Sequence, residues 1–266
     1  MRKVSGGVVL AIALFLTFMQ PALAGPVMDR ILKKGELVVG TTGEQPPLNA
    51  VAKNGDIIGM DADIARIIAK TLEVRLEFKV MPFNDLLPAV AAGEVDMVIS
   101  SMTITPQRNR KLAFVGPYYM SGKGLITKTK TLPQLQKSAA LNDSRMTVAV
   151  LQGSTSQKFA EQAAPQAKLV KTKSYDAAIG MLLVDKVDAI VADFPYCAFT
   201  AYRYKDKGLV AGESPISYEP LGIVVAEDTL MINWLENFIE MLKGTGLLKK
   251  IHTRWFQDGS WIEQLR

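Results

Sequence analysis

The chain has 266 residues, a formal net charge of +5, and a composition in which 48% of residues are hydrophobic and 21% are charged. This length exceeds what one small core needs and suffices for two lobes. The small, dispersed positive charge argues against a nucleic-acid-binding protein. Cys197 is the single cysteine, so no intramolecular disulfide forms, and its apolar surroundings predict a buried small side chain.

The first 24 residues have the organisation of a signal peptide. Arg2 and Lys3 form a basic start, residues 8–19 form an apolar core too short to span a bilayer comfortably, and residues 21–24 end in the small residues of a cleavage site. Cleavage after Ala24 removes two of the 31 basic residues and none of the 26 acidic ones, which leaves a net charge of +3. We therefore expect a protein exported to the periplasm or the extracellular space. An uncleaved N-terminal anchor is the alternative.

Apolar strands alternate with amphipathic helices along the rest of the chain. Strands are expected at 36–42, 75–81, 97–99, 121–129, 146–151, 168–171, 188–193 and 222–225, and helices at 28–34, 64–72, 86–92, 157–163, 175–183, 231–242 and 247–255. This alternation predicts an α/β architecture with mainly parallel sheets. The strand at 146–151 has no polar alternation, which predicts burial on both faces.

A weak internal repeat suggests two lobes with the same plan. Residues 93–100 resemble residues 185–192, and each segment precedes a polar residue at the carboxyl end of a strand, Ser101 and Asp193. Because ligands of open α/β sheets bind beyond the carboxyl ends of strands, the two ends would form a shared cleft. A coincidence between two common βαβ segments is the alternative.

The first candidate anion site follows the strand at 97–99. Thr105 is a suitable N-cap and Pro106 a suitable first helical residue. A helix N-terminus attracts anions, and Arg108 in the first turn can hold a carboxylate through two hydrogen bonds. The alternative is a solvated helix start with a surface arginine.

A second candidate lies at residues 153–156, between a buried strand and a helix. Backbone N–H groups and the hydroxyls of Ser154 and Thr155 converge there, but the segment lacks the glycine spacing and the lysine of a phosphate-binding loop. An ordinary N-cap is the alternative. Asp193 ends a buried strand and needs a partner, which a ligand ammonium would supply; a helix cap or a hinge hydrogen bond is the alternative.

Catalytic and metal-binding signals are weak. His252 is the only histidine, which excludes a histidine-rich metal site and argues against a Ser-His-Asp triad. Asp61 and Asp63 lie at a helix start, where the helix dipole explains them better than a metal. We therefore predict no cofactor and no metal.

Seven segments together carry a family resemblance: 37–41 (Leu-Val-Val-Gly-Thr), 59–63 (Gly-Met-Asp-Ala-Asp), 83–88, 100–108 with Thr103-Ile-Thr105, 114–119, 153–155 and 192–193. With the leader, they resemble the solute-binding proteins of ABC importers, in particular the family that binds polar amino acids. The Thr-Ile-Thr-x-x-Arg element followed by Pro-Tyr-Tyr is fairly specific. Met60 departs from the pattern, because an aromatic residue is usual there.

The resemblance implies a type II periplasmic-binding-protein fold with a ligand cleft between two lobes. Two crossings, near 119–123 and 218–222, would form the hinge. The first lobe would contain residues 25–120 and 222–266, and the second residues 121–221.

The resemblance also implies roles for individual residues. Arg108 would hold the ligand α-carboxylate, with Thr103 and the Thr155 region across the cleft. Asp193 and the Ser101 backbone would hold the α-ammonium. The predicted ligand-binding residues are Thr42, Gln45, Phe83, Ser100, Ser101, Thr103, Arg108, Ser154, Thr155 and Asp193.

One departure concerns the loop after the first strand. Family members often carry an acidic residue and a stacking aromatic there, where this chain has Thr42 and Gln45. This weakens the case for a basic amino acid, although Glu44 is close. Ser100 and Phe83 would line the side-chain pocket.

The function implied is that of a monomeric solute receptor. It would bind a small zwitterion, close its lobes by hinge motion and deliver the ligand to an ABC permease in the inner membrane, without covalent chemistry. One alternative is an enzyme on the same fold, such as a cyclohexadienyl dehydratase, which needs a cleft acid beyond Asp193. A ligand-sensing partner of a membrane receptor is another.

Overall fold

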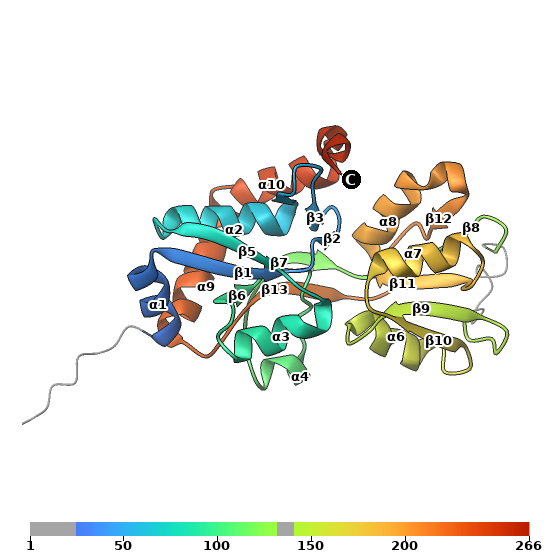
Figure 1. Ribbon diagram of the computed structural model, residues 1–266, viewed down its shortest axis with the longest axis horizontal. Coiled ribbons are helices and arrows are strands. Elements are labelled where there is room, and N and C mark those ends of the chain that lie inside the picture. The colour runs from blue at the N-terminus through green and yellow to red at the C-terminus, as the bar shows by residue number, and fades with distance from the viewer. Residues whose placement is uncertain (1–24, 132–140, 266) are drawn as a thin grey trace, which may run out of the picture.

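The computed structural model describes residues 25–131 and 141–265, so the predicted signal peptide lies outside the described residues. Two five-stranded sheets form the centres of two lobes (Figure 1). The first sheet has the order β5 (Arg75–Val80), β1 (Glu36–Thr41), β6 (Met97–Val98), β13 (Glu219–Val225), β7 (Ala113–Ser121). The second has the order β10 (Lys168–Thr172), β9 (Thr147–Leu151), β11 (Ala189–Asp193), β8 (Lys123–Lys128), β12 (Leu209–Ala211).

The two sheets share one pairing pattern. In each, the first three strands pair in parallel and the remaining two are joined by antiparallel pairing. A small third sheet adds β2 (Glu44–Gln45), β3 (Asn49–Val51) and β4 (Ile57–Ile58) to the first lobe. No strand was expected between 42 and 75, because strands of two or three residues are too short to show alternation.

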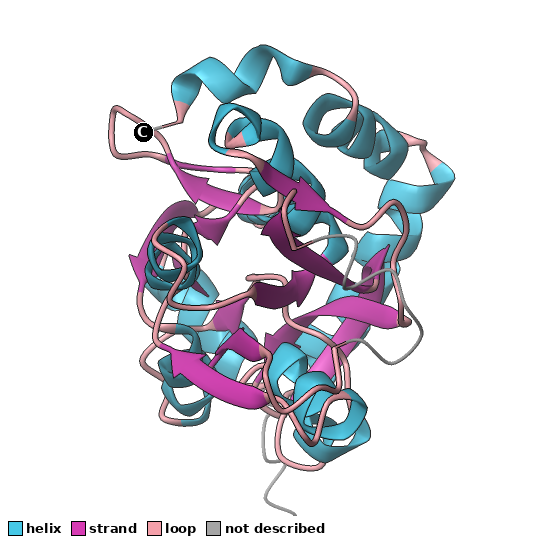
Figure 2. Cartoon of the chain, turned by 90° about the vertical axis from the view of Figure 1, so that its right-hand side faces the viewer, coloured by secondary structure: helices cyan, strands magenta, loops and turns pink. Residues whose placement is uncertain are grey.

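Helices lie on both sides of the strands (Figure 2). The first lobe carries α1 (Pro26–Lys34), α2 (Met60–Thr71), α3 (Phe83–Ala91), α4 (Pro106–Asn109), α9 (Thr229–Gly244), α10 (Leu247–Phe256) and the 3₁₀ helix η2 (Gly259–Gln264). The second lobe carries α6 (Thr155–Ala163), α7 (Tyr175–Leu183), α8 (Phe194–Arg203) and η1 (Lys205–Lys207). Helix α8 was not predicted. Within the described ranges, no helix is both long and apolar enough to cross a membrane.

Buried strands form the core of each lobe. Residues 148–151 of β9 and all of β11 are buried, which confirms the predicted burial of β9 on both faces. Helices α6 and α7 both contact β9 and β11, so neither strand faces solvent. Cys197 is fully buried on α8, as its apolar surroundings predict, and burial raises the pKa of its thiol.

The two crossings between the lobes run side by side. Strand β7 pairs with β13, with Ser121 opposite Glu219 and Tyr119 opposite Leu221, and β8 begins only two residues after β7 ends. A Cβ added at Gly122 would lie 2.3 Å from the carbonyl oxygen of Ser217, so only glycine permits this approach. The predicted lobe boundaries fall at the end of β7 and inside β13, and they remain a proposal.

Helices α4 and α6 both begin after a side chain that caps the helix N-terminus. The hydroxyl of Thr105 accepts a hydrogen bond from the backbone N–H of Arg108, and Pro106 is the first residue of α4, as predicted. Helix α6 begins at Thr155, two residues before the predicted start, because Ser154 is its N-cap and accepts from the backbone N–H of Gln157.

A single buried carboxylate joins the starts of α1 and α9. Asp228 Oδ2 accepts hydrogen bonds from the backbone N–H groups of Val27 at 2.8 Å and Met28 at 3.0 Å. Its Oδ1 accepts from the backbone N–H of Met231 at 2.9 Å, which caps α9. Asp228 therefore supplies the cap that Gly25, the N-cap residue of α1, has no side chain to provide.

We expect Asp228→Ala to lower the free energy of unfolding by about 3 kcal/mol, because it removes one cap and leaves three buried N–H groups without their acceptor. Urea unfolding at neutral pH measures this. Ser174→Ala removes a partly exposed cap of α7 and should cost only about 1 kcal/mol. Equal losses in the two variants would contradict the role assigned to Asp228.

Candidate functional site

The carboxyl ends of strands from both lobes meet at one place. The Thr103 hydroxyl of the first lobe lies 3.2 Å from the Thr155 hydroxyl of the second, within hydrogen-bond distance. Arg108 Nη2 lies 3.4 Å from the carbonyl oxygen of Gly153. The structure thus brings three of the predicted site residues, Thr103, Arg108 and Thr155, together across the two lobes.

Arg108 is held in place at the end of the first sheet. Its Nη1 donates to the carbonyl oxygen of Thr103 at 3.0 Å, and its guanidinium carbon lies 5.7 Å from the centre of the Phe83 ring. Burial lowers the pKa of Arg108, while the carboxylates of Asp193 and Glu219 oppose that shift. Arginine remains charged at any physiological pH, so a fixed, partly dehydrated cation faces the cleft.

The hydroxyls of Thr42 and Ser100 are bonded within the first lobe. Ser100 Oγ accepts from the backbone N–H of Thr42 at 3.0 Å, and Thr42 Oγ1 donates to Asn49 Oδ1 at 2.9 Å. Both residues are buried. They shape the wall of the site at the end of β1, next to Gln45, which is buried in β2.

A buried acid lies beneath this wall. Asp61 accepts hydrogen bonds from Asn49 Nδ2 at 2.8 Å, the backbone N–H of Ser101 at 2.9 Å and the Tyr118 hydroxyl at 2.9 Å. Burial raises the pKa of Asp61 to about 6, because desolvation outweighs these three hydrogen bonds. The helix dipole, which the sequence pattern indicated, is therefore only part of the role of Asp61.

Asp61 also changes what Ser101 can do. The Ser101 backbone N–H is already bonded to Asp61, and an N–H group cannot accept from an ammonium. Of the backbone groups of Ser101, only the carbonyl oxygen can therefore make the predicted ammonium contact. Ser101 has a positive φ of 50°, which is costly for a residue other than glycine.

A cavity of about 330 Å³ extends from this wall towards the second lobe. Its lining includes Thr42, Glu44, Gln45, Phe83 and Tyr175. Burial raises the pKa of Glu44, and the nearby Asp176 raises it further. Ser154 lies in the second lobe, where it is a buried N-cap that also donates to the carbonyl oxygen of Leu151 at 2.6 Å. Ser154 therefore serves as a helix cap, and its role in ligand binding stays a prediction.

Asp193 has a protein partner that the sequence did not reveal. Lys123 is 1% exposed, and its Nζ lies 2.5 Å from Asp193 Oδ1 and 3.4 Å from Glu219 Oε2. Asp193 does not cap α8 with its side chain, so the helix-cap alternative is wrong. The other alternative, a hydrogen bond at the hinge, is present, because Lys123 stands opposite Asp193 on the neighbouring strand and donates to it. The contact between Asp193 and a ligand ammonium stays a prediction.

Lys123 and Glu219 were missed for different reasons. Lys123 follows a crossing, where a lysine normally indicates solvent. Glu219 lies 96 positions further along the chain and reaches Lys123 only because β7 and β13 pair at the hinge. His252 lies partly buried on α10, stacked against Phe256 with ring centres 4.5 Å apart. No cluster with the composition of a metal site occurs among residues 25–131 and 141–265.

A family model supplies the decisive comparison. Residues 37–258 match the model of the bacterial extracellular solute-binding proteins, family 3. The chain belongs to this family. Its fold is the two-lobed type II periplasmic-binding-protein fold, as predicted.

Similar proteins include receptors and one enzyme. The ABC transporter arginine-binding protein 1 of Escherichia coli (strain K12) is 28% identical and aligns with 82% of this chain and 89% of its own length. A solved structure from Wolinella succinogenes, described as a putative binding component of an ABC transporter complexed with lysine, is also similar. It is 31% identical, has a TM-score of 0.82, and the match covers 86% of this chain and 99% of that chain. The cyclohexadienyl dehydratase of Pseudomonas aeruginosa is 23% identical and covers 86% of each chain.

We expect Asp61 to make stability depend on pH. Its pKa is raised from 3.8 to about 6 on folding, so the folded protein binds the proton more tightly than the unfolded chain does. This contribution to stability is complete below about pH 4 and is lost as pH rises through about 6. Between about pH 4 and pH 7, the free energy of unfolding of the wild-type protein should therefore fall by roughly 3 kcal/mol more than that of Asp61→Asn.

Urea unfolding across this pH range checks the prediction. Asp206→Asn, which removes an exposed carboxylate, controls for the loss of one charge. Parallel pH profiles for the wild type and Asp61→Asn would show that Asp61 does not titrate in this range.

Proposed function

We propose that this protein is the extracytoplasmic solute receptor of an ABC transporter, and that it binds a polar amino acid between its two lobes. The observation that carries this proposal is that opposite charges occur where the lobes meet, close enough for Asp193 to act electrostatically on Arg108. Arg108 supplies a cation at the end of the first lobe, and Asp193 supplies an anion at the end of the second. A zwitterion presents the complementary arrangement over a few ångströms.

The carboxylate end of the ligand would bind Arg108. Its guanidinium is fixed by the Thr103 carbonyl and by the Phe83 ring, so little side-chain entropy remains to be lost on binding. The hydroxyls of Thr103 and Thr155 lie beside it and can each donate to a carboxylate oxygen. Charge-assisted hydrogen bonds of this kind are roughly twice as strong as neutral ones.

The ammonium end would bind Asp193 and the Ser101 carbonyl oxygen. Lys123 engages Asp193 through Oδ1, and a carboxylate has a second oxygen to offer. The ligand side chain would extend into the cavity beside Glu44, Gln45 and Phe83, with Thr42 and Ser100 behind it. The acidic Glu44 and the arginine and lysine named for relatives make cationic amino acids the first ligands to test.

Closure of the lobes would sequester the ligand. The Thr103–Thr155 contact and the Arg108–Gly153 contact both cross between lobes, so ligand binding and closure would reinforce each other. The closed form would then dock on a permease in the inner membrane, as a monomer exported by its signal peptide. Binding energy would come from hydrogen bonds and charge pairs rather than covalent chemistry.

An enzyme on this fold is the second candidate, because one relative is a cyclohexadienyl dehydratase. Such a reaction requires an acid beyond Asp193, and Glu219 and Glu44 both lie near the site. Incubation of purified protein with prephenate and with arogenate tests this candidate. Turnover of either compound would overturn the proposal of a receptor without enzymatic activity.

A thermal-shift screen over amino acids and small organic acids, followed by calorimetric titration of the hits, tests the receptor proposal directly. Stabilisation by polar amino acids supports it. Stabilisation confined to acids that lack an amino group would contradict the binding of a zwitterion.

We expect Arg108→Ala to abolish ligand-induced thermal stabilisation, because the α-carboxylate loses its charged partner. A ligand at 100 times its Kd stabilises a protein by about 2.7 kcal/mol, and this whole shift should disappear. Arg110→Ala removes an exposed arginine of the same segment and should leave the shift unchanged. Unchanged affinity in Arg108→Ala would show that the carboxylate binds elsewhere.

A further inference from the structure

Three charged side chains form a buried cluster at the hinge, which we call the hinge triad: Lys123, Asp193 and Glu219. They are 1%, 6% and 9% exposed, respectively. Charges are costly to bury unless they are paired, and this cluster contains two carboxylates but one ammonium. The hinge triad therefore carries a net charge of −1 in a region sheltered from solvent.

The single cation is shared unequally. Lys123 Nζ lies 2.5 Å from Asp193 Oδ1 but 3.4 Å from Glu219 Oε2. Glu219 Oε2 is buried and forms no hydrogen bond with the described residues. The lysine is thus hydrogen-bonded to Asp193, and Glu219, paired with Lys123 only at the longer distance, is the carboxylate whose charge is less fully compensated.

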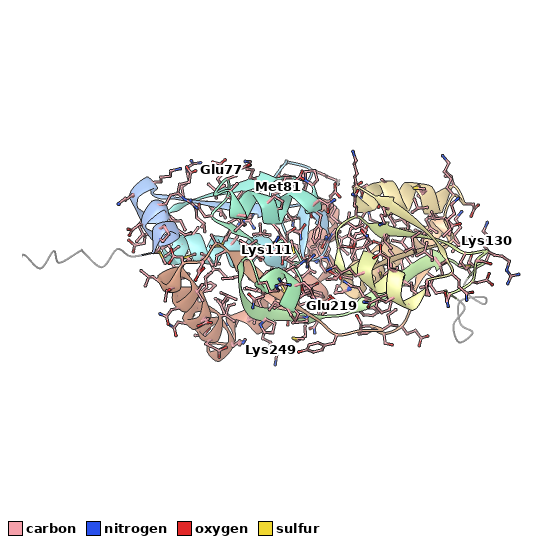
Figure 3. The ribbon with its side chains drawn as sticks, turned by 90° about the horizontal axis from the view of Figure 1, so that it is seen from below. Glu77, Met81, Lys111, Lys130, Glu219 and Lys249 are labelled. Atoms are coloured by element: carbon pink, nitrogen blue, oxygen red, sulfur yellow. The ribbon has the colours of Figure 1, made fainter. Side chains whose placement is uncertain are left out.

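The position of Glu219 makes this excess charge relevant to the ligand site. It lies on β13 opposite Ser121 of β7, between the two lobes (Figure 3). Both Asp193 and Glu219 act electrostatically on Arg108, so both carboxylates lie within range of the cation that faces the cleft. The site therefore has a positive pole at Arg108 and a negative pole at the hinge triad.

We propose that Glu219 determines the specificity of the site for an α-ammonium group, because it keeps the negative pole charged although Lys123 pairs with Asp193. This inference rests on the proposed function, and it assigns to Glu219 the negative charge that binding of the ligand ammonium requires. With Asp193 and Lys123 alone, the pole would be a neutral ion pair and would attract an ammonium only through its dipole. Glu219 adds a full negative charge, which favours an ammonium over an uncharged hydroxyl at the same carbon.

The test compares ligands that differ only at that group. L-arginine, L-lysine and L-glutamine are titrated calorimetrically against their 2-hydroxy acid analogues, in which a hydroxyl replaces the ammonium. The quantity measured is the ratio of the two Kd values for each pair. Glu219→Gln should reduce the preference for the amino acid by at least about tenfold, because the hinge triad becomes neutral.

A double variant separates charge from packing. Lys123→Gln combined with Glu219→Gln removes one charge of each sign, which returns the cluster to −1 through Asp193 alone. The preference for the amino acid should then recover to within a few-fold of the wild type. A purely structural role for Glu219 predicts the opposite, since the double variant removes more native contacts than the single one.

Glu213→Gln is the matched control, because it removes an exposed carboxylate of the same segment and should leave the ratio unchanged. An unaltered ratio in Glu219→Gln, or no recovery in the double variant, would overturn the inference while leaving the receptor function intact. A wild-type protein that binds the hydroxy acids as tightly as the amino acids would overturn both. Thermal unfolding without ligand establishes that each variant is folded.

Discussion

The pairing of β7 with β13 is the constraint on which the site depends. These two strands belong to the first sheet, yet they continue into the second lobe, so the crossings are held side by side. Every contact between the strand ends of the two lobes, including Thr103 with Thr155, forms only if this pairing sets the distance between the sheets. The same pairing brings Glu219 to Lys123.

The buried carboxylates of this protein fall into two kinds, according to whether every oxygen is hydrogen-bonded. Asp228 and Asp61 are buried acids that accept three hydrogen bonds each, and both tie together segments distant in the chain. The hinge triad differs, because one of its oxygens has no hydrogen bond among the described residues. The fully bonded buried acids Asp228 and Asp61 stabilise the first lobe, whereas a buried acid with an excess charge is suited to act on a ligand.

Much of the fold was predictable because it depends on local patterns. Apolar strands, amphipathic helices and the Thr105–Pro106 helix start are each encoded within about ten residues. The strand-end positions of Arg108, Thr103 and Thr155 followed from the same patterns together with the family resemblance. Their roles in ligand binding remain predictions.

What the sequence could not predict depends on distant pairing. Lys123 and Glu219 read as ordinary surface charges beside turns, and only the antiparallel pairing of β8 with β11 and of β7 with β13 buries them together. The partner of Asp193 was missed for the same reason, because Lys123 lies 70 positions earlier in the chain. Short strands such as β2 and β4 were missed because two residues carry no periodic signal.

The cross-strand position of Lys123 has a consequence for how this scaffold can diverge. Lys123 stands opposite Asp193 in the β8–β11 register, so the backbone alone fixes where its side chain emerges. Substitutions at 123 and 219 would therefore alter the charge at the cleft without shifting a strand or a helix. Substitutions at these two hinge positions could therefore change the ligand, or the chemistry, of this fold without any change in its hydrophobic core.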